Sequence, residues 1–193
     1  PFMLHIGPAT KVLPAAYNNA GKAKVTDWLG GGENLRFKDY MVLSMAPQMF
    51  LASLVHGGVF ERFPQLRGGV IELGAGWVPE FLRSLDMAHR MFRKSDPSVT
   101  EMSVRPSEYI RRAVKFTPFA GEDVGRMIRD AGPELFLFSS DYPHPEGTKD
   151  PIGKFEATME GISEADKDRF YALNFDEMMG DPVGSPARQA VAA

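Results

Sequence analysis

An unbroken apolar run that ends in a polar cluster constrains the fold of this chain most. Residues 135–138 form the run, Asp141 follows it closely, and His144 stands between two prolines. Continuous apolar runs are typical of strands buried on both faces, as in parallel sheets covered by helices, where ligands bind at the carboxyl ends of the strands. We therefore expect a buried strand that brings Asp141 to the polar mouth of a site.

Segments with strand and helix patterns alternate along the chain. Short apolar runs predict strands at residues 2–4, 69–73, 113–117 and 135–138. Apolar residues at helical spacing predict helices at residues 38–55, 79–92 and 121–131, and a final helix after the capping sequence at residues 163–166. Alternation of this kind is typical of an α/β layer with a parallel sheet.

Four such units correspond to about half of a (β/α)8 TIM-type barrel, which usually has roughly 250 residues. We expect residues 1–180 to form the C-terminal half of such a barrel, and the other half to precede Pro1. Residues 181–193 lack periodicity and are expected to be a mobile tail. Pro47 lies inside the predicted helix 38–55 and should kink it or divide it in two.

The composition disfavours several classes of function. A net charge of -3 over 193 residues offers no basic surface for a phosphate backbone, so no nucleic-acid partner is expected. The chain has no cysteine, which excludes thiolate chemistry and leaves histidines and carboxylates as metal ligands. No run of about 18 apolar residues predicts a membrane span, so we expect a cytoplasmic protein that binds a small-molecule substrate.

Two candidate metal ligands stand directly after predicted strands, where barrel and doubly wound folds gather their sites. His5 follows the first strand and could bind a divalent ion, although a core histidine bonded to a neighbouring loop is an equally good interpretation. Asp141 follows the fourth strand and could bind metal or accept a proton from water; the alternative is a cap for the next turn. For Asp141 the functional interpretation is favoured, because Tyr142 and His144 add polar groups beside it.

Glu72 and His144 are further candidate catalytic residues. Glu72 lies near the end of the second strand, where an acid must face a polar cavity or pair with a buried arginine such as Arg111 or Arg112. His144 could orient a substrate or support Asp141. A purely structural loop contact is an equally good interpretation of His144.

Other notable residues favour structural interpretations. His56 ends a predicted helix, where a cation complements the helix dipole, and His89 is expected on the surface. Met41, Met45 and Met49 recur at four-residue spacing, which predicts a stripe in the hydrophobic core.

Four segments together resemble the amidohydrolase-related family, whose members include aminocarboxymuconate-semialdehyde decarboxylase and resorcylate-type decarboxylases. The segments are residues 2–5, 57–67, 72–79 and 140–147, in consistent order. The resemblance extends from Pro1 to about Met179. It implies a (β/α)8 barrel that holds one divalent metal at the carboxyl ends of its strands.

The resemblance also assigns residues. His5 matches the metal-binding histidine after the fifth strand, and Asp141 matches the carboxylate after the eighth. Zn²⁺ is the preferred ion, with Mn²⁺ or Mg²⁺ as alternatives. The first-strand ligand pair of the family is absent from this chain, and Leu73 stands where many members carry a catalytic histidine, so Glu72 or His144 is expected to replace it or the chemistry to differ.

These observations predict a metal-dependent hydrolase or decarboxylase that acts on a small carboxylate, ester, lactone or amide. Its expected partner is the N-terminal half of the same protein, and a homo-oligomer is an alternative. A catalytically inactive half-barrel that serves as an interaction or vestigial module is the rival hypothesis. A flavodoxin-like open sheet is disfavoured, because no glycine-rich phosphate loop occurs early in the chain.

Overall fold

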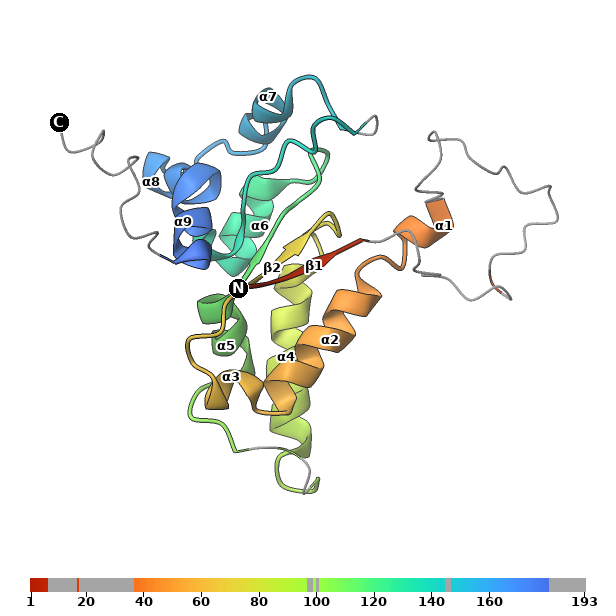
Figure 1. The fold of residues 1–193 in the computed structure, drawn as a ribbon, viewed down its shortest axis with the longest axis vertical. Helices are drawn as coiled ribbons and strands as arrows, with labels where there is room; N and C mark the ends of the chain where they lie inside the picture. The colour runs from red at the N-terminus through yellow and green to blue at the C-terminus, as the bar shows by residue number, and fades with distance from the viewer. Residues whose placement is uncertain (7–16, 18–36, 97–98, 100, 145–146, 181–193) are drawn as a thin grey trace.

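A parallel three-stranded sheet lies at the centre of the molecule (Figure 1). The computed structural model describes residues 1–6, 17, 37–96, 99, 101–144 and 147–180. The strands are β1 (Phe2–His5), β2 (Gly68–Ile71) and β3 (Val114–Phe116), in the order β1-β2-β3, and both pairs are parallel. The predicted α/β class with a parallel sheet is therefore confirmed. The predicted mobile tail at residues 181–193 lies outside the described residues.

Helices connect the strands and follow the last one. Between β1 and β2 lie α1 (Phe37–Tyr40), α2 (Met45–His56) and α3 (Val59–Arg62). Between β2 and β3 lie α4 (Val78–Phe92) and α5 (Pro106–Ala113). After β3 come α6 (Val124–Ala131), the 3-10 helix η1 (Pro133–Leu135), α7 (Pro151–Glu156), α8 (Glu164–Asp168), the π-helix η2 (Arg169–Leu173) and α9 (Asn174–Met179). Among the described residues, no helix is long and apolar enough to cross a membrane.

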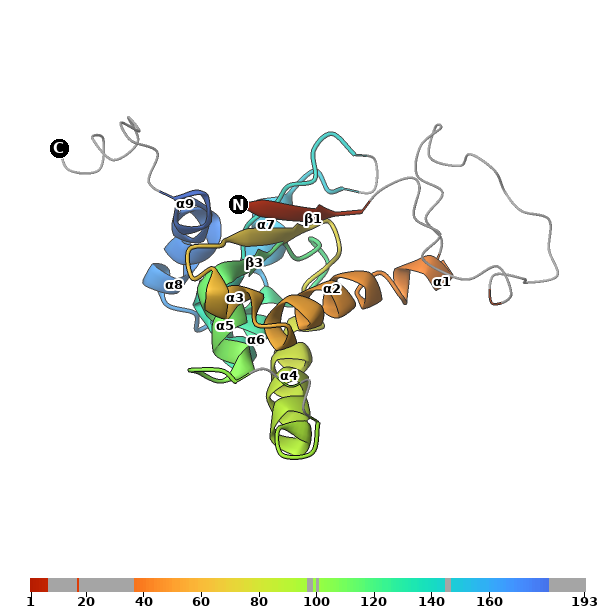
Figure 2. The same ribbon diagram turned by 60° about the horizontal axis from the view of Figure 1, so that its bottom comes forward.

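The hydrophobic core lies on one face of the sheet. Figure 2 shows α2, α4, α5 and α6 on the same side of the strands. Val70 on β2 and Phe116 on β3 are fully buried in this cluster. Burial alternates along β1, so Phe2 and Leu4 pack against the core while His5 is exposed. The helices thus cover one face and leave the carboxyl ends of the strands to polar residues.

The fourth predicted strand, at residues 135–138, is only partly correct. η1 takes up its first residue, and a single parallel bridge joins Phe136 to Phe116. The amide of Leu137 donates to the carbonyl of Phe116 at 2.9 Å, which continues the sheet beside β3. The next amide, that of Phe138, donates instead to the carbonyl of Phe170 in η2. The chain therefore leaves the sheet before a full strand forms.

The predicted helix at residues 38–55 is divided in two. α1 ends at Tyr40 and α2 begins at Met45, which places Pro47 in the first turn of α2. A proline in that turn removes no hydrogen bond from the helix, because the first amides have no partner within it. The division expected from Pro47 is therefore confirmed.

The prediction that three methionines form a core stripe is wrong. Met41, Met45 and Met49 expose 75%, 55% and 64% of their surface. The buried residues of α2 are Pro47, Leu51 and Val55. They also recur every four residues, but start two residues away from Met45, which is about 200° around a helix. Four-residue spacing identified a face of the helix without showing which face is buried in the core.

Buried or capping polar groups hold the C-terminal helices. Ser163 Oγ accepts a hydrogen bond from the amide of Asp166 at 3.2 Å, so the predicted cap is confirmed. Asn174 is fully buried, and its Nδ2 donates to the carbonyls of Pro133 at 2.7 Å and Phe136 at 2.9 Å. Asn174 therefore attaches α9 to the segment that runs beside β3.

A buried lysine adds a second attachment. Lys115 on β3 is 1% exposed, and its Nζ donates to the carbonyl of Glu134 at 2.7 Å. The carboxylate of Glu177 on α9 lies 3.5 Å from the same Nζ. Burial lowers the pKa of Lys115, and the nearby Glu177 opposes that shift. The lysine therefore connects β3 to α9 at the cost of burying its charge.

Candidate functional site

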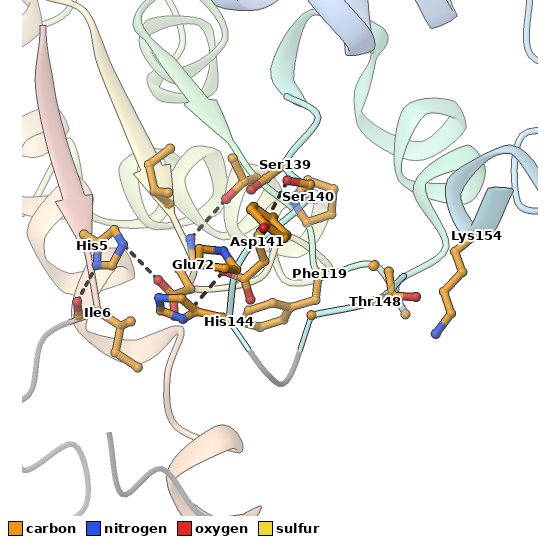
Figure 3. A pocket seen from close by; sticks show the side chains of 18 of the residues that line it. His5, Ile6, Glu72, Phe119, Ser139, Ser140, Asp141, His144, Thr148 and Lys154 are labelled. Carbon is orange, nitrogen blue, oxygen red and sulfur yellow. Dashed lines mark hydrogen bonds and ion pairs between the residues drawn. The ribbon is translucent and has the colours of Figure 1, made fainter. Parts of the chain in front are cut away.

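The carboxyl ends of the strands open into one pocket. β1 ends at His5, β2 is followed by Glu72, and the segment beside β3 leads to Asp141 and His144. Because the strands are parallel, these ends lie at the same edge of the sheet, as Figure 3 shows. The pocket has a volume of about 710 Å³, and all four sequence-predicted site residues line it.

Glu72 lies between the two histidines of the pocket. Its Oε2 is 2.9 Å from His5 Nε2, and its Oε1 is 3.7 Å from His144 Nδ1. Its backbone amide donates to Thr117 Oγ1 at 3.1 Å, which joins the end of β2 to the end of β3. Of the two arginines considered as alternative partners, Arg111 pairs with Glu134 and Arg112 donates to the carbonyl of Phe60. The carboxylate of Glu72 therefore faces the pocket rather than a buried arginine.

Asp141 and His144 lie close to each other on the loop that follows the segment beside β3. Asp141 Oδ1 is 3.9 Å from His144 Nδ1, and the amide of His144 donates to the carbonyl of Asp141 at 2.9 Å. Asp141 has φ 56° and Glu72 has φ 58°, so both carboxylate residues adopt the left-handed conformation that non-glycine residues seldom use. Strained backbone of this kind clusters at functional sites.

Both ring nitrogens of His5 face oxygen atoms. Nδ1 hydrogen-bonds to the carbonyl of Ile6, and Nε2 faces the carboxylate of Glu72. A neutral imidazole carries one proton, so when Nδ1 donates to Ile6 the lone pair of Nε2 points toward Glu72. Either a second proton or a cation at Nε2 satisfies this arrangement. His5 can therefore act as a donor to Glu72 or as a metal ligand.

Three of the four side chains form a tight group of possible metal ligands. One ligand atom each from Glu72, Asp141 and His144 lies within 4.8 Å of the others. His5 lies outside this group and is connected to it through Glu72. The assignment of His5 and Asp141 to one shared ion stays a prediction.

The remaining histidines lie outside the pocket lining. His56 is the last residue of α2, as predicted, and His89 lies on α4. Burial lowers the pKa of His56, and the charge of His89 lowers it further. Neither residue lines the pocket. The lowered pKa disfavours the cationic form of His56 that was expected to complement the helix dipole.

Sequence reasoning missed a glutamate that organises the loops around the pocket. The carboxylate of Glu122 accepts hydrogen bonds from the amides of Ala75 at 2.9 Å, Gly76 at 2.7 Å and Phe119 at 2.8 Å. It thereby joins the loop that follows Glu72 to the loop that follows β3. Phe119 is three positions away along the chain, but Ala75 and Gly76 are 47 and 46 positions away, so no local pattern marks the role of Glu122 in joining the two loops.

Aromatic and cationic side chains complete the lining. Tyr40, Phe119 and Tyr142 line the pocket, and Lys154 on α7 lines its far side (Figure 3). Burial and then the charge of Glu122 raise the pKa of Tyr40, so this hydroxyl keeps its proton and can donate a hydrogen bond. Lys154 was not predicted from the sequence, because it lies on a helix and not at the end of a strand.

Solved structures with a similar fold are amidohydrolases and decarboxylases. An amidohydrolase from Mycobacterium avium subsp. paratuberculosis is 27% identical, with a TM-score of 0.69, and the match covers 93% of this chain and 42% of that protein. A 5-carboxyvanillate decarboxylase from Novosphingobium aromaticivorans, complexed with manganese and 4-hydroxy-3-methoxy-5-nitrobenzoic acid, is 20% identical, with a TM-score of 0.62 over 91% of this chain and 47% of its own. A 2,6-dihydroxybenzoate decarboxylase from Rhizobium is 21% identical, with a TM-score of 0.59 over 91% of this chain and 50% of its own. No protein-family model matches the chain.

The neighbours agree with the resemblance that the four sequence segments carry. At 20% and 21% identity, the two decarboxylases show a shared fold and no more. This chain spans about half the length of each of the three proteins. Its structural neighbours are therefore members of the amidohydrolase superfamily, the family that the sequence indicated.

Proposed function

We propose that this chain is the C-terminal half of a (β/α)8 barrel in a metal-dependent hydrolase or decarboxylase. Its parallel strands, connecting helices and similarity to about half of several amidohydrolases and decarboxylases support the proposal. One observation carries the functional part: two carboxylates and two histidines line a single pocket, and they come from the ends of β1 and β2 and from the loop after the segment beside β3. Catalytic residues at the carboxyl ends of several strands are typical of this type of barrel.

A divalent ion fits the donor chemistry of the pocket. Imidazole nitrogens and carboxylate oxygens both bind Zn²⁺, and Mn²⁺ accepts the same donors. His5 and Asp141 are the ligands that the family resemblance assigns. When bound, such an ion activates water or polarises an oxygen of the substrate. Zn²⁺ is our first choice, and the manganese in the neighbouring decarboxylase supports Mn²⁺ as an alternative.

The protein's own residues have separate roles in the proposed reaction. Asp141 moves a proton to or from the reacting atom, because its carboxylate lies at the pocket wall within reach of a bound water or substrate. Glu72 takes the place of the histidine that many family members carry after the sixth strand. His144 orients the substrate and Asp141, which lies beside its ring.

The pocket lining favours a small, partly apolar acid or acid derivative. Tyr40, Phe119 and Tyr142 supply aromatic surface, and Lys154 supplies a positive charge opposite the carboxylates. A volume of about 710 Å³ is in the usual range for small-molecule sites, about 300–1,000 Å³. We therefore propose a carboxylate, ester, lactone or amide substrate with a ring.

The proposed partner of this chain is the first half of the barrel. β1 forms one edge of the described sheet, so its outer side is open to a further strand. Met45 and Met49 on α2 are exposed and present an apolar surface to a neighbouring helix. A homo-oligomer in which a second copy takes that place is the alternative. Gel filtration with light scattering distinguishes a monomer from either assembly.

Metal analysis tests the proposed function. We expect the purified protein to bind about one equivalent of Zn²⁺ or Mn²⁺, and His5→Ala and Asp141→Asn to lose most of it, because each variant removes one ligand. His89→Ala and Asp130→Asn are matched controls on exposed or peripheral positions of α4 and α6, and should keep the metal. Full metal content in both site variants would refute the ligand assignment.

Substrate screening distinguishes the enzyme from the rival hypothesis. Hydroxylated aromatic carboxylates are assayed for release of carbon dioxide, and aryl esters, lactones and amides for hydrolysis, with and without added Mn²⁺ or Zn²⁺. The proposal predicts metal-dependent turnover of at least one class once the barrel is complete. A stable, metal-free monomer that is inert toward every class supports the inactive interaction module instead.

A further inference from the structure

We propose that Glu72 and His144 bind the divalent ion together with Asp141, so that this half of the barrel contains a three-residue metal site of its own. The inference rests on the proposed function, since it concerns the same ion. It keeps Asp141 as a ligand and adds Glu72 and His144, which the family resemblance does not assign. His5 then holds Glu72 in place and is not itself one of the three ligands. Figure 3 shows the three side chains close together at the mouth of the pocket.

The distances within this group fit a shared ion better than direct hydrogen bonds. His144 Nδ1 is 3.7 Å from Glu72 Oε1 and 3.9 Å from Asp141 Oδ1. Hydrogen bonds between nitrogen and oxygen are about 2.7–3.2 Å long, so both separations are too large. Two ligands that each lie about 2.0–2.2 Å from one ion are about 3–4 Å apart, depending on the angle between them. Both observed separations lie in that interval.

The contact of Glu72 with His5 is different in kind. His5 Nε2 lies 2.9 Å from Glu72 Oε2, which is a hydrogen-bond distance. Glu72 therefore has one oxygen held by His5 and the other directed toward His144 and Asp141. A partner on one carboxylate oxygen orients the other oxygen toward a metal, as is common around metal ligands.

A cation also suits the charge of the group, in addition to the contacts that Glu72 makes with His5 and His144. Glu72 is 12% exposed and Asp141 is 28% exposed in their side chains, and their ligand atoms are within 4.8 Å of each other. Two partly buried carboxylates at such a distance repel each other, and removal from water raises the cost. A divalent ion between them cancels this repulsion and accepts the lone pair of the imidazole at the same time.

The donor set defines the class of ion. One nitrogen and two carboxylate oxygens suit Zn²⁺ and Mn²⁺, whereas Mg²⁺ prefers oxygen donors alone. Three protein ligands leave coordination positions open for water and substrate, which is typical of catalytic rather than structural sites. The site is therefore suited to a reaction at the ion.

Titration of the metal-free 193-residue chain with Mn²⁺ and with Zn²⁺ tests the inference. Isothermal titration calorimetry gives the affinity, and paramagnetic resonance of free Mn²⁺ confirms it. We expect Glu72→Gln, His144→Gln and Asp141→Asn each to weaken binding by at least about tenfold, since each removes a ligand. Glu108→Gln and His89→Gln remove the same groups outside the pocket and should bind as the wild type does.

A spectroscopic measurement identifies the ligand atom. In chains labelled with ¹⁵N-histidine, Zn²⁺ should shift the resonance of His144 Nδ1 more than that of Nε2, because Nδ1 faces both carboxylates. Circular dichroism of each variant confirms that the fold persists. This readout does not depend on activity or on the missing half of the barrel.

The outcomes separate this inference from the proposed function. Wild-type affinity in both Glu72→Gln and His144→Gln, with metal lost in Asp141→Asn, overturns the three-residue site and leaves a metal-dependent function standing. If the wild-type chain binds neither ion, the inference is also overturned. The proposed function would then be tested by measuring metal binding to the completed barrel. Loss of binding in all three site variants with unchanged controls supports the inference.

Discussion

Replacing Glu122 by glutamine should destabilise the loops that carry the pocket. The carboxylate receives the amides of Ala75, Gly76 and Phe119 from two loops. The point where a Cβ of residue 76 would lie is 2.8 Å from Glu122 Oε1, so any larger residue at this position would displace the carboxylate. The hydrogen bonds of the Glu122 side chain thus hold the two loops together.

The size of the effect follows from the acceptors that glutamine keeps. Oε2 accepts from Ala75 and Phe119, and Oε1 accepts from Gly76. Glutamine retains one oxygen and replaces the other by an NH₂ group, which cannot accept from an amide. Hydrogen bonds to charged groups contribute about 1.5–3 kcal/mol, and water reaches this half-buried site in part, so we expect a loss of about 2–3 kcal/mol in the free energy of unfolding.

Urea denaturation followed by circular dichroism measures this loss. Glu80→Gln is the control, because Glu80 is 71% exposed and pairs with Arg83 of the same helix. An exposed pair of that kind contributes about 0.3–0.5 kcal/mol, so the control should remain close to the wild type. If Glu122→Gln unfolds at the same urea concentration as Glu80→Gln, the three hydrogen bonds do not hold the loops and the reasoning is wrong.

Two further predictions concern packing and buried charge. Gly125→Ala should destabilise the protein by about 1–3 kcal/mol, because the added Cβ would lie 1.9 Å from the carbonyl oxygen of Thr158. Gly121→Ala is its control, since a Cβ there meets nothing within 4 Å, and equal melting temperatures for the two variants would contradict the prediction. Lys115→Met removes the donor to the carbonyl of Glu134 and the partner of Glu177, so it should lower the free energy of unfolding at neutral pH by about 1–3 kcal/mol. The pKa of Lys115 in the folded protein is lowered below the usual 10.5, so the folded protein releases this proton at a lower pH than the unfolded chain does. The stability of the wild type should therefore rise between the folded pKa and 10.5, and this rise should be absent in Lys115→Met; urea titrations that show the same pH dependence for both proteins would contradict the prediction.

The strand positions and the general place of the site could be predicted from the sequence. The predicted strands at residues 2–4 and 69–73 correspond to β1 and β2, and His5 is the last residue of β1. Glu72 was expected within the second strand, but β2 ends at Ile71, so Glu72 lies just beyond it at the same edge of the sheet as His5. The reason is physical: the carboxyl ends of parallel strands lie at the same edge of the sheet. Residues at the ends of different strands therefore come close together even when they are far apart in the sequence. Asp141 was identified by the same argument, although the run before it forms a single bridge rather than a full strand.

Tertiary structure decided what the spacing of residues leaves open. Two sets of residues on α2 recur every four positions, one with Met45 and Met49 and one with Pro47, Leu51 and Val55. Only the packing of α2 in the folded protein shows that Leu51 is buried while Met49 is exposed. The partners of Glu72 could not be inferred either, because His5 and His144 are 67 and 72 positions away, and a left-handed backbone at residue 72 directs its side chain.

The sequence by itself determined the alternation of strands and helices and the polar residues at the strand ends, because local periodicity and strand polarity suffice for both. The distances among Glu72, Asp141 and His144 depend on how segments that are far apart in the sequence pack together, and so does the connection that Glu122 makes between two loops. The packing of the whole core determines which loops come together, because no short stretch of sequence encodes it.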